Sequence, residues 1–152
     1  MNRLLQQLVS EAPDAILIAD RDGVILFWNS GAERIFGYTA TEAVGQSLDL
    51  IIPGNLRKRH WEGYRRVMAA GETKYHTGLL SSPGASKDGT RISLEFSMAL
   101  LRNETGGMLG CASIMRDVTQ RWQKENEMKE RLAACESKLE AGPNPVTKEI
   151  TS

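Results

Sequence analysis

The sequence has little that would support a disulfide framework, a metal cluster or a membrane span. Its 152 residues include only two cysteines, Cys111 and Cys135, and these form no Cys-x-x-Cys pair. We therefore expect neither a disulfide scaffold nor a zinc cluster, and the cysteine content favours the reducing cytoplasm. No apolar run approaches the roughly 18 residues that a membrane-spanning helix needs. The first residues also lack the uninterrupted apolar segment of a secretory leader, so no membrane association is expected.

An excess of charge of one sign is missing too. Nineteen Lys and Arg residues balance nineteen Asp and Glu residues, which gives no electrostatic argument for a nucleic-acid partner. The sequence contains no Walker loop, no HExxH and no GxSxG motif, and no spacing of His, Ser, Cys and Asp suggests a catalytic group. We therefore expect a single domain that is not an enzyme.

Several short elements are predicted in the first half of the chain. The apolar spacing within residues 1–11 indicates a short helix. Two β-branched runs at 15–20 and 23–29 flank Asp22-Gly23, which is a strong hairpin signal. Residues 30–52 carry helix caps and glycines at short intervals, and so predict a series of short helices. A longer helix is expected over residues 55–70, ending at Gly71.

Three strands are predicted next. We expect the first over residues 73–81, followed by a turn at Pro83-Gly84. Residues 91–100 alternate strictly between apolar and other side chains, which indicates a strand with one buried face. The last strand is expected over residues 108–119. Two strands, a helical block and three strands predict an α+β fold, with an antiparallel sheet, helices on one face and a pocket between them.

Residues 119–141 are strongly helical, and an incomplete heptad seam runs along them. The seam consists of Val118, Trp122, Met128, Leu132, Cys135 and Leu139. One interpretation is a marginal coiled coil that forms a homodimer; the other is an amphipathic helix that packs on its own domain. The tail, residues 142–152, is expected to be disordered.

Several short strings occur in an order and spacing that resemble the PAS family. They are FWNSGAE (27–33), FGYT (36–39), EAVG (42–45), KDGT (87–90) and RDVT (116–119). The resemblance implies a PAS fold, namely a five-stranded antiparallel sheet with short helices on one face. It also implies a cap helix (1–11), a sensory domain (12–118) and a signalling helix (119–141). A sensory function would need a downstream output domain or partner protein.

Residues 56–64, LRKRHWEGY, resemble the helix that carries the proximal haem histidine in the FixL-type, haem-binding subset. The matching residue is His60, which implies haem b ligation and sensing of a diatomic gas or of redox state. Neutral imidazole is a suitable iron ligand. The expected cofactor-binding residues are His60, Tyr64, Val67, Met68, Leu80, Phe96, Met98 and Arg66. Lys58 and Arg59 would join Arg66 around the propionates, and Ile92 and Leu94 would extend the apolar wall.

The sequence departs from this subset at one position. FixL-type sensors carry an oxygen-contacting arginine where this chain has Leu80, preceded by Leu79. An apolar wall favours sensing of carbon monoxide, nitric oxide or redox state over oxygen sensing that depends on an arginine contact. Met98 or Met115 could be a sixth ligand, or either could be a packing residue. His76 is the other histidine, and we regard it as a weak candidate ligand.

A haem-free PAS module is the alternative. It would serve for dimerisation or for binding a small metabolite. Non-covalent flavin is a further alternative, because Phe27 and Trp28 could stack on a ring, although both are also typical core residues. The light-driven covalent flavin chemistry of some relatives needs a cysteine that residues 46–49 lack.

Overall fold

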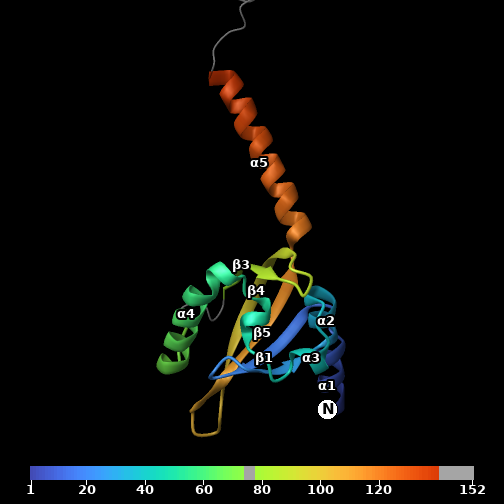
Figure 1. The fold of residues 1–152 in the computed structure, drawn as a ribbon, viewed down its shortest axis with the longest axis vertical. Coiled ribbons are helices and arrows are strands. Elements are labelled where there is room, and N and C mark those ends of the chain that lie inside the picture. The colour runs from blue at the N-terminus through green and yellow to red at the C-terminus, as the bar shows by residue number, and fades with distance from the viewer. Residues whose placement is uncertain (74–77, 141–152) are drawn as a thin grey trace, which may run out of the picture. The chain divides into compact units, whose positions relative to one another are not determined.

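The structure, a computed structural model, describes residues 1–73 and 78–140 and divides into two compact units. The first unit, Met1–Val118, combines a five-stranded sheet with several helices (Figure 1). The second unit begins at Thr119, and its described part is a single helix, α5 (Thr119–Glu140). The α+β class and the five-stranded antiparallel sheet are thereby confirmed.

The strands of the first unit form one antiparallel sheet in the order β2-β1-β5-β4-β3. They are β1 (Ala15–Asp20), β2 (Ile25–Trp28), β3 (Leu80–Ala85), β4 (Arg91–Arg102) and β5 (Met108–Asp117). Strands β2 and β3 are consecutive in the chain but lie at opposite edges of the sheet. The chain between them must therefore cross the sheet, and this crossing places the helical block over one face.

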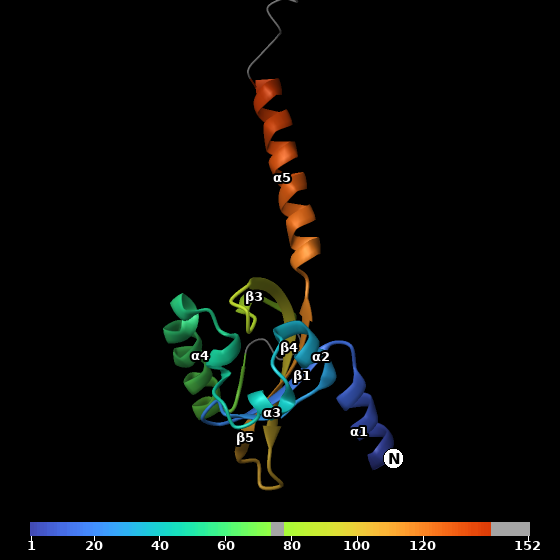
Figure 2. The same cartoon turned by 45° about the vertical axis from the view of Figure 1, so that its right-hand side comes forward.

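The helical elements are α1 (Asn2–Glu11), α2 (Ser30–Phe36), α3 (Ala40–Ala43), η1 (Leu48–Ile51), η2 (Gly54–Leu56) and α4 (Arg57–Ala70). Figure 2 shows α4 on the left and α1 on the right, with α2 and α3 between them. Local signals set their ends: Asn29 caps α2, and Thr39 with Glu42 forms a capping box at α3. Helix α4 ends at Gly71, whose φ of 69° is left-handed and favours glycine.

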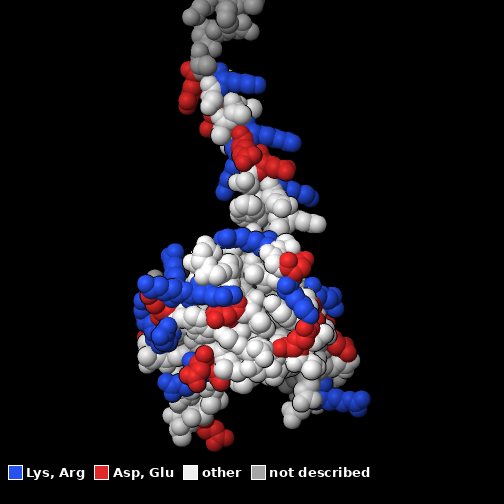
Figure 3. Space-filling view, in the orientation of Figure 1, with Lys and Arg blue, Asp and Glu red and all other residues white. Residues whose placement is uncertain are grey.

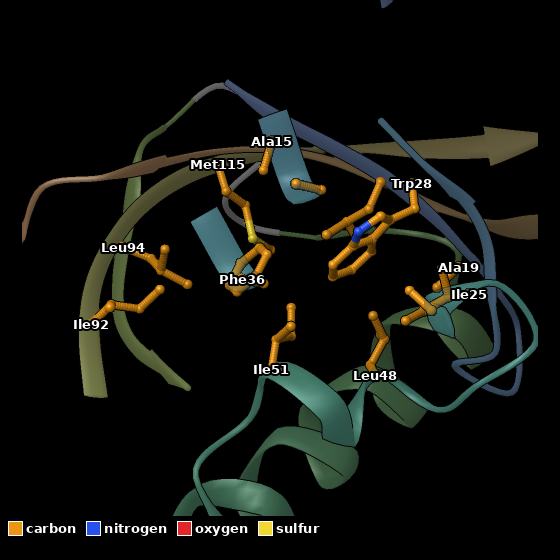
Figure 4. Close-up of a cluster of buried hydrophobic side chains, with 13 residues drawn as sticks. Ala15, Ala19, Ile25, Trp28, Phe36, Leu48, Ile51, Ile92, Leu94 and Met115 are labelled. Carbon is orange, nitrogen blue, oxygen red and sulfur yellow. The ribbon is translucent and has the colours of Figure 1, made fainter. Parts of the chain in front are cut away.

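The inner face of the sheet and the helical block share one hydrophobic core. Burial alternates along β1, as expected of a strand with one face covered. The largest fully buried side chains are Phe36 of α2, Ile25 of β2 and Ile51 of η1. In Figure 4, Leu48 and Ile51 point from η1 toward the side chains of the sheet. Residues of the crossing segment thus supply the layer that covers the sheet.

The third strand is present, but its predicted bounds, 73–81, and the predicted turn at Pro83-Gly84 were wrong; residues 74–77 of that range lie outside the described residues. Strand β3 begins at Leu80 and ends at Ala85, so Pro83 and Gly84 lie within it and form no turn. Because β3 is an edge strand, it tolerates a proline that cannot donate a hydrogen bond. A Cβ at Gly84 would lie 2.6 Å from Leu94 Cδ1, so a larger residue there would require the Leu94 side chain to shift. Pro-Gly marks a tightly packed edge strand here.

Helix α5 is continuous over 22 residues, and the predicted seam residues from Trp122 to Leu139 fall within it. An ion pair between Arg121 and Glu125, at 3.8 Å, spans one turn near its start. None of the helices in the described ranges has both the length and the apolar character that crossing a bilayer requires.

Candidate functional site

A cavity of about 820 Å³ lies between the helical block and the inner face of the sheet. Its walls come from η1 and α4 on one side and from β1, β3, β4 and β5 on the other. The volume lies in the range of small-molecule and cofactor sites, and most lining side chains are apolar. The pocket predicted between helices and sheet is therefore present.

Helix α4 is held against the domain by two aromatic side chains. The Tyr64 hydroxyl donates a hydrogen bond to the carbonyl of Asp20 at 2.5 Å, and Trp61 Nε1 donates to Asp49 Oδ1 at 2.8 Å. The Trp61 ring also fills the space beside Gly23, where a Cβ would lie only 2.1 Å from the ring. These contacts fix the rotation of α4 about its axis, and with it the residues that face the cavity.

His60 lies on the cavity-facing side of α4 and is half-buried. Its ring contacts Trp61 edge-on, with 4.8 Å between ring centroids, and lies 5.8 Å from the ring of Tyr64. The Nδ1 atom is buried and has no hydrogen-bond partner within the described ranges. Burial lowers the pKa of His60 below its usual value, against the opposing effect of the Asp49 carboxylate. Burial therefore favours the neutral imidazole over the charged form.

All eight residues predicted to bind the cofactor line this one cavity. They are His60, Tyr64, Val67, Met68, Leu80, Phe96, Met98 and Arg66. Met115, Leu94 and Arg59 also line it. Burial raises the pKa of Tyr64, whose hydroxyl is already bonded to Asp20. The structure thus brings the predicted residues together, while their roles toward a ligand stay predictions.

The wall opposite α4 is apolar at the position that departs from the FixL-type pattern. Leu80 is the first residue of β3, pairs with Phe96 of β4 and lines the cavity. Among the lining residues the cations are Arg59 and Arg66, both on α4. In Figure 3, Lys and Arg side chains gather over α4. Positive charge therefore lies along the helix side of the cavity, and among the described lining residues the strands contribute no cationic donor.

Other predicted residues lie away from the cavity lining. Ile92 is buried in the core, and Lys58 is exposed on α4. Trp28 is buried, and its Nε1 donates to the Tyr38 carbonyl at 2.9 Å. Neither Trp28 nor Phe27 lines the cavity, so the proposed stacking of these rings on a flavin there has no support. His76 lies outside the described residues.

Two lining residues of β5 were missed by the sequence reasoning. Cys111 and Ser113 are buried and share the inner face of β5 with Met115. The period of two along a strand, counted back from Met115, would have found them. Burial raises the pKa of the Cys111 thiol, which keeps it protonated and apolar in character. Cys111 therefore contributes to the wall as a small hydrophobic residue.

Two known sensor proteins are similar to most of this chain. The chain is 26% identical over 126 residues to the sensor protein FixL of Bradyrhizobium diazoefficiens, covering 83% of this chain and 25% of FixL. It is 26% identical over 122 residues to the oxygen sensor protein DosP of Escherichia coli, covering 80% of this chain and 15% of DosP. The chain thus spans a quarter or less of the length of these relatives.

A solved structure of an RNA-binding light-oxygen-voltage receptor superposes with a TM-score of 0.72 at 23% identity, covering 88% of this chain and 37% of that chain. At this identity the likeness shows the fold alone. The family model described as "PAS fold" matches residues 9–123, which include every strand of the sheet and most of the helical elements. The chain therefore belongs to the PAS fold family.

Proposed function

We propose that this chain is a sensory PAS module that binds haem b in its cavity, with His60 as the axial ligand to iron. The observation that supports the proposal is the setting of His60, which lines a large, mostly apolar cavity and whose buried Nδ1 has no hydrogen-bond partner within the described part of the chain. A buried polar atom without a hydrogen bond costs about 1–3 kcal/mol. Such a residue is typical of a site that is completed by a ligand.

The surrounding residues fit this group. The cavity is mostly apolar, which suits a porphyrin, and burial favours the neutral imidazole that iron needs. Arg59 and Arg66 provide cations at the lining for the two propionates. When bound, haem would supply an iron centre that binds a gas or changes its oxidation state. His60 would hold that centre on α4, and the apolar strands would exclude water.

We infer that the signal is a diatomic gas such as carbon monoxide or nitric oxide, or redox state. Leu80 removes the donor that would favour a bound oxygen molecule. Met98 and Met115 both line the cavity and are the candidate sixth ligands. A methionine ligand would support redox sensing, because a His/Met pair raises the potential of haem iron.

Strand β5 offers a route for the signal. Cys111, Ser113 and Met115 line the cavity, and the same strand ends at Asp117, just before the start of α5. We propose that the functional unit is a cytoplasmic homodimer held by both terminal helices, with a downstream output domain or partner protein. A ligand would bias the paired helices only through different affinities for their two arrangements.

Titration with haemin tests the proposal. The wild type should develop a Soret band at one equivalent, His60→Ala should lose it, and Glu62→Ala, at an exposed position of the same helix outside the cavity lining, should keep it. In His60→Gly, added imidazole should restore the band, which a purely structural role of His60 would not allow. An unchanged spectrum in His60→Ala would refute the ligand assignment. No binding by the wild type would favour a haem-free module that binds a metabolite or flavin, or that only dimerises.

A further inference from the structure

Gly63 occupies a position of α4 from which a side chain would enter the cavity. It lies in the interior of the helix and lines the cavity. Its helical neighbours three and four residues away are Arg59, His60, Arg66 and Val67, and all four line the cavity as well. Because residues at these spacings share one face of a helix, the missing side chain of Gly63 would point into the cavity between them.

The fold itself does not require glycine at this position. Within the described residues, a Cβ at Gly63 would meet no heavy atom within 4 Å outside its immediate neighbourhood. The backbone of Gly63 is helical, not left-handed. Gly23 differs on both counts, since its φ is 81° and the Trp61 ring occupies the space beside it. A helix-interior glycine without a packing reason is costly, because glycine is a poor helix former.

We propose that Gly63 determines which ligands the cavity accepts, because it leaves room beside His60 for the edge of a flat ring system. A tetrapyrrole ligated by His60 would lie against the bare α4 backbone at this point, where any larger residue would displace it. The inference rests on the proposed function and deepens it. Gly63 thereby lowers the stability of the helix and leaves space next to the ligating histidine.

Two substitutions separate this role from a structural one. Gly63→Ala should raise the unfolding temperature of the haemin-free protein by about 2–4 °C, because alanine is the better helix former. The same change should weaken haemin binding about tenfold, and Gly63→Leu should weaken it about a hundredfold through overpacking. Ala69→Leu adds the same side chain at an exposed position of α4 outside the cavity lining. It should leave haemin affinity within about threefold of the wild type.

The measurements are haemin titration, circular dichroism and thermal unfolding of all four proteins. Opposite signs for stability and affinity in Gly63→Ala support the inference, and this variant decides the question if Gly63→Leu does not fold. A lower unfolding temperature in Gly63→Ala, or wild-type haemin affinity in Gly63→Leu, would overturn it.

If the wild type binds no haemin, the haem proposal is refuted, but the role of Gly63 in ligand access can still be tested. The fluorescent probe 1-anilinonaphthalene-8-sulfonate then replaces haemin. Loss of its fluorescence in Gly63→Leu, but not in Ala69→Leu, would support the role of Gly63 in admitting flat aromatic ligands. Equal fluorescence in the two variants, or none in the wild type, would overturn that role.

Discussion

Removing the side-chain amide of Asn29 should strongly destabilise the first unit. Asn29 is only 3% exposed. Its Oδ1 accepts hydrogen bonds from the N–H groups of Ile16 (2.8 Å) and Ala32 (2.9 Å), and its Nδ2 donates to the carbonyls of Val9 (2.9 Å) and Asp14 (3.0 Å). One buried amide therefore ties the end of α1 to the start of β1 and to the first turn of α2.

The magnitude follows from the groups that Asn29→Ala would leave without partners. Loss of the N-cap of α2 costs about 1 kcal/mol. Each further buried N–H or carbonyl that loses its hydrogen bond adds about 1–3 kcal/mol, less where water can reach it. Since Asn29 serves groups on three segments, we expect a total loss of about 3–5 kcal/mol. That is a large part of the roughly 5–15 kcal/mol that stabilises a typical domain.

Urea unfolding of the haemin-free protein measures this loss. Asn29→Asp is the informative companion, because it keeps the two acceptor bonds and replaces the donating Nδ2 with an oxygen that faces the carbonyls of Val9, Ala12 and Asp14. It should lose about 2 kcal/mol or more. The control is Asn126→Ala, an exposed position on α5, which should change stability by less than about 0.5 kcal/mol.

Two outcomes would refute the reasoning about Asn29. If Asn29→Asp were as stable as the wild type, the bonds from Nδ2 to the Val9 and Asp14 carbonyls would contribute nothing. If Asn29→Ala lost less than about 1 kcal/mol, water would have to replace the whole set of bonds, and the amide would not hold the segments together.

Three further predictions concern gas binding, pH and assembly. The ferrous haem protein should bind carbon monoxide and autoxidise readily in air, and Leu80→Arg should slow autoxidation; a long-lived oxy spectrum in the wild type would contradict this. Hydrogen bonds from the Lys87 side chain, which has the largest effect, and from the Thr39 backbone lower the pKa of Glu42 from 4.5 to about 2. Glu42 therefore takes up a proton at a higher pH in the unfolded state than in the folded state, and the free energy of unfolding should fall as pH drops from about 4.5 towards 2. Acid unfolding should show a shallower fall for Glu42→Gln, and identical profiles would count against the ion pair. Truncation after Thr119 should weaken dimerisation in sedimentation velocity and leave haemin binding nearly intact; a full-length chain that stays monomeric at high micromolar concentration would remove the coiled coil.

Local sequence signals were sufficient for most of the fold. The Asp22-Gly23 hairpin and the alternation along residues 91–100 define strands that the structure contains. Such signals depend on neighbours in sequence, and a strand or hairpin expresses them directly. Gly71 likewise ends α4 through its own left-handed backbone. Elements whose ends are set locally are therefore predictable from the sequence alone.

Contacts between distant segments were not predictable in this way. The strand character of Pro83-Gly84 depends on β3 lying at the edge of the sheet and on the packing of Leu94 against it. The bonds of Asn29 depend on the return of α1 and β1 to the start of α2. The sequence shows an asparagine in a suitable place for a cap, but not the carbonyls that its Nδ2 reaches.

The candidate site was largely predictable because one helix face and one sheet face form it. Residues three and four apart on α4, and alternate residues on β4, meet across the cavity whatever the details of the loops. The resemblance identified His60, but Gly63 was overlooked. A missing side chain gives no signal of its own until the neighbours on both sides are known to face a cavity.

The anchoring of α4 determines how a ligand can act on this domain. On one side of His60 the helix is tied to the β1–β2 turn through Tyr64 and to η1 through Trp61. At its end, the carbonyl of Gly71 accepts a hydrogen bond from Arg102 of β4. In the proposed haem complex, a helix fixed at both places could not retreat far from a ligand bound to His60. A change in the ligand would therefore displace the apolar wall of β4 and β5, where Met98 and Met115 are adaptable side chains. Since β5 leads directly to Thr119, displacement of the strands is the response that could reach α5 in the proposed mechanism.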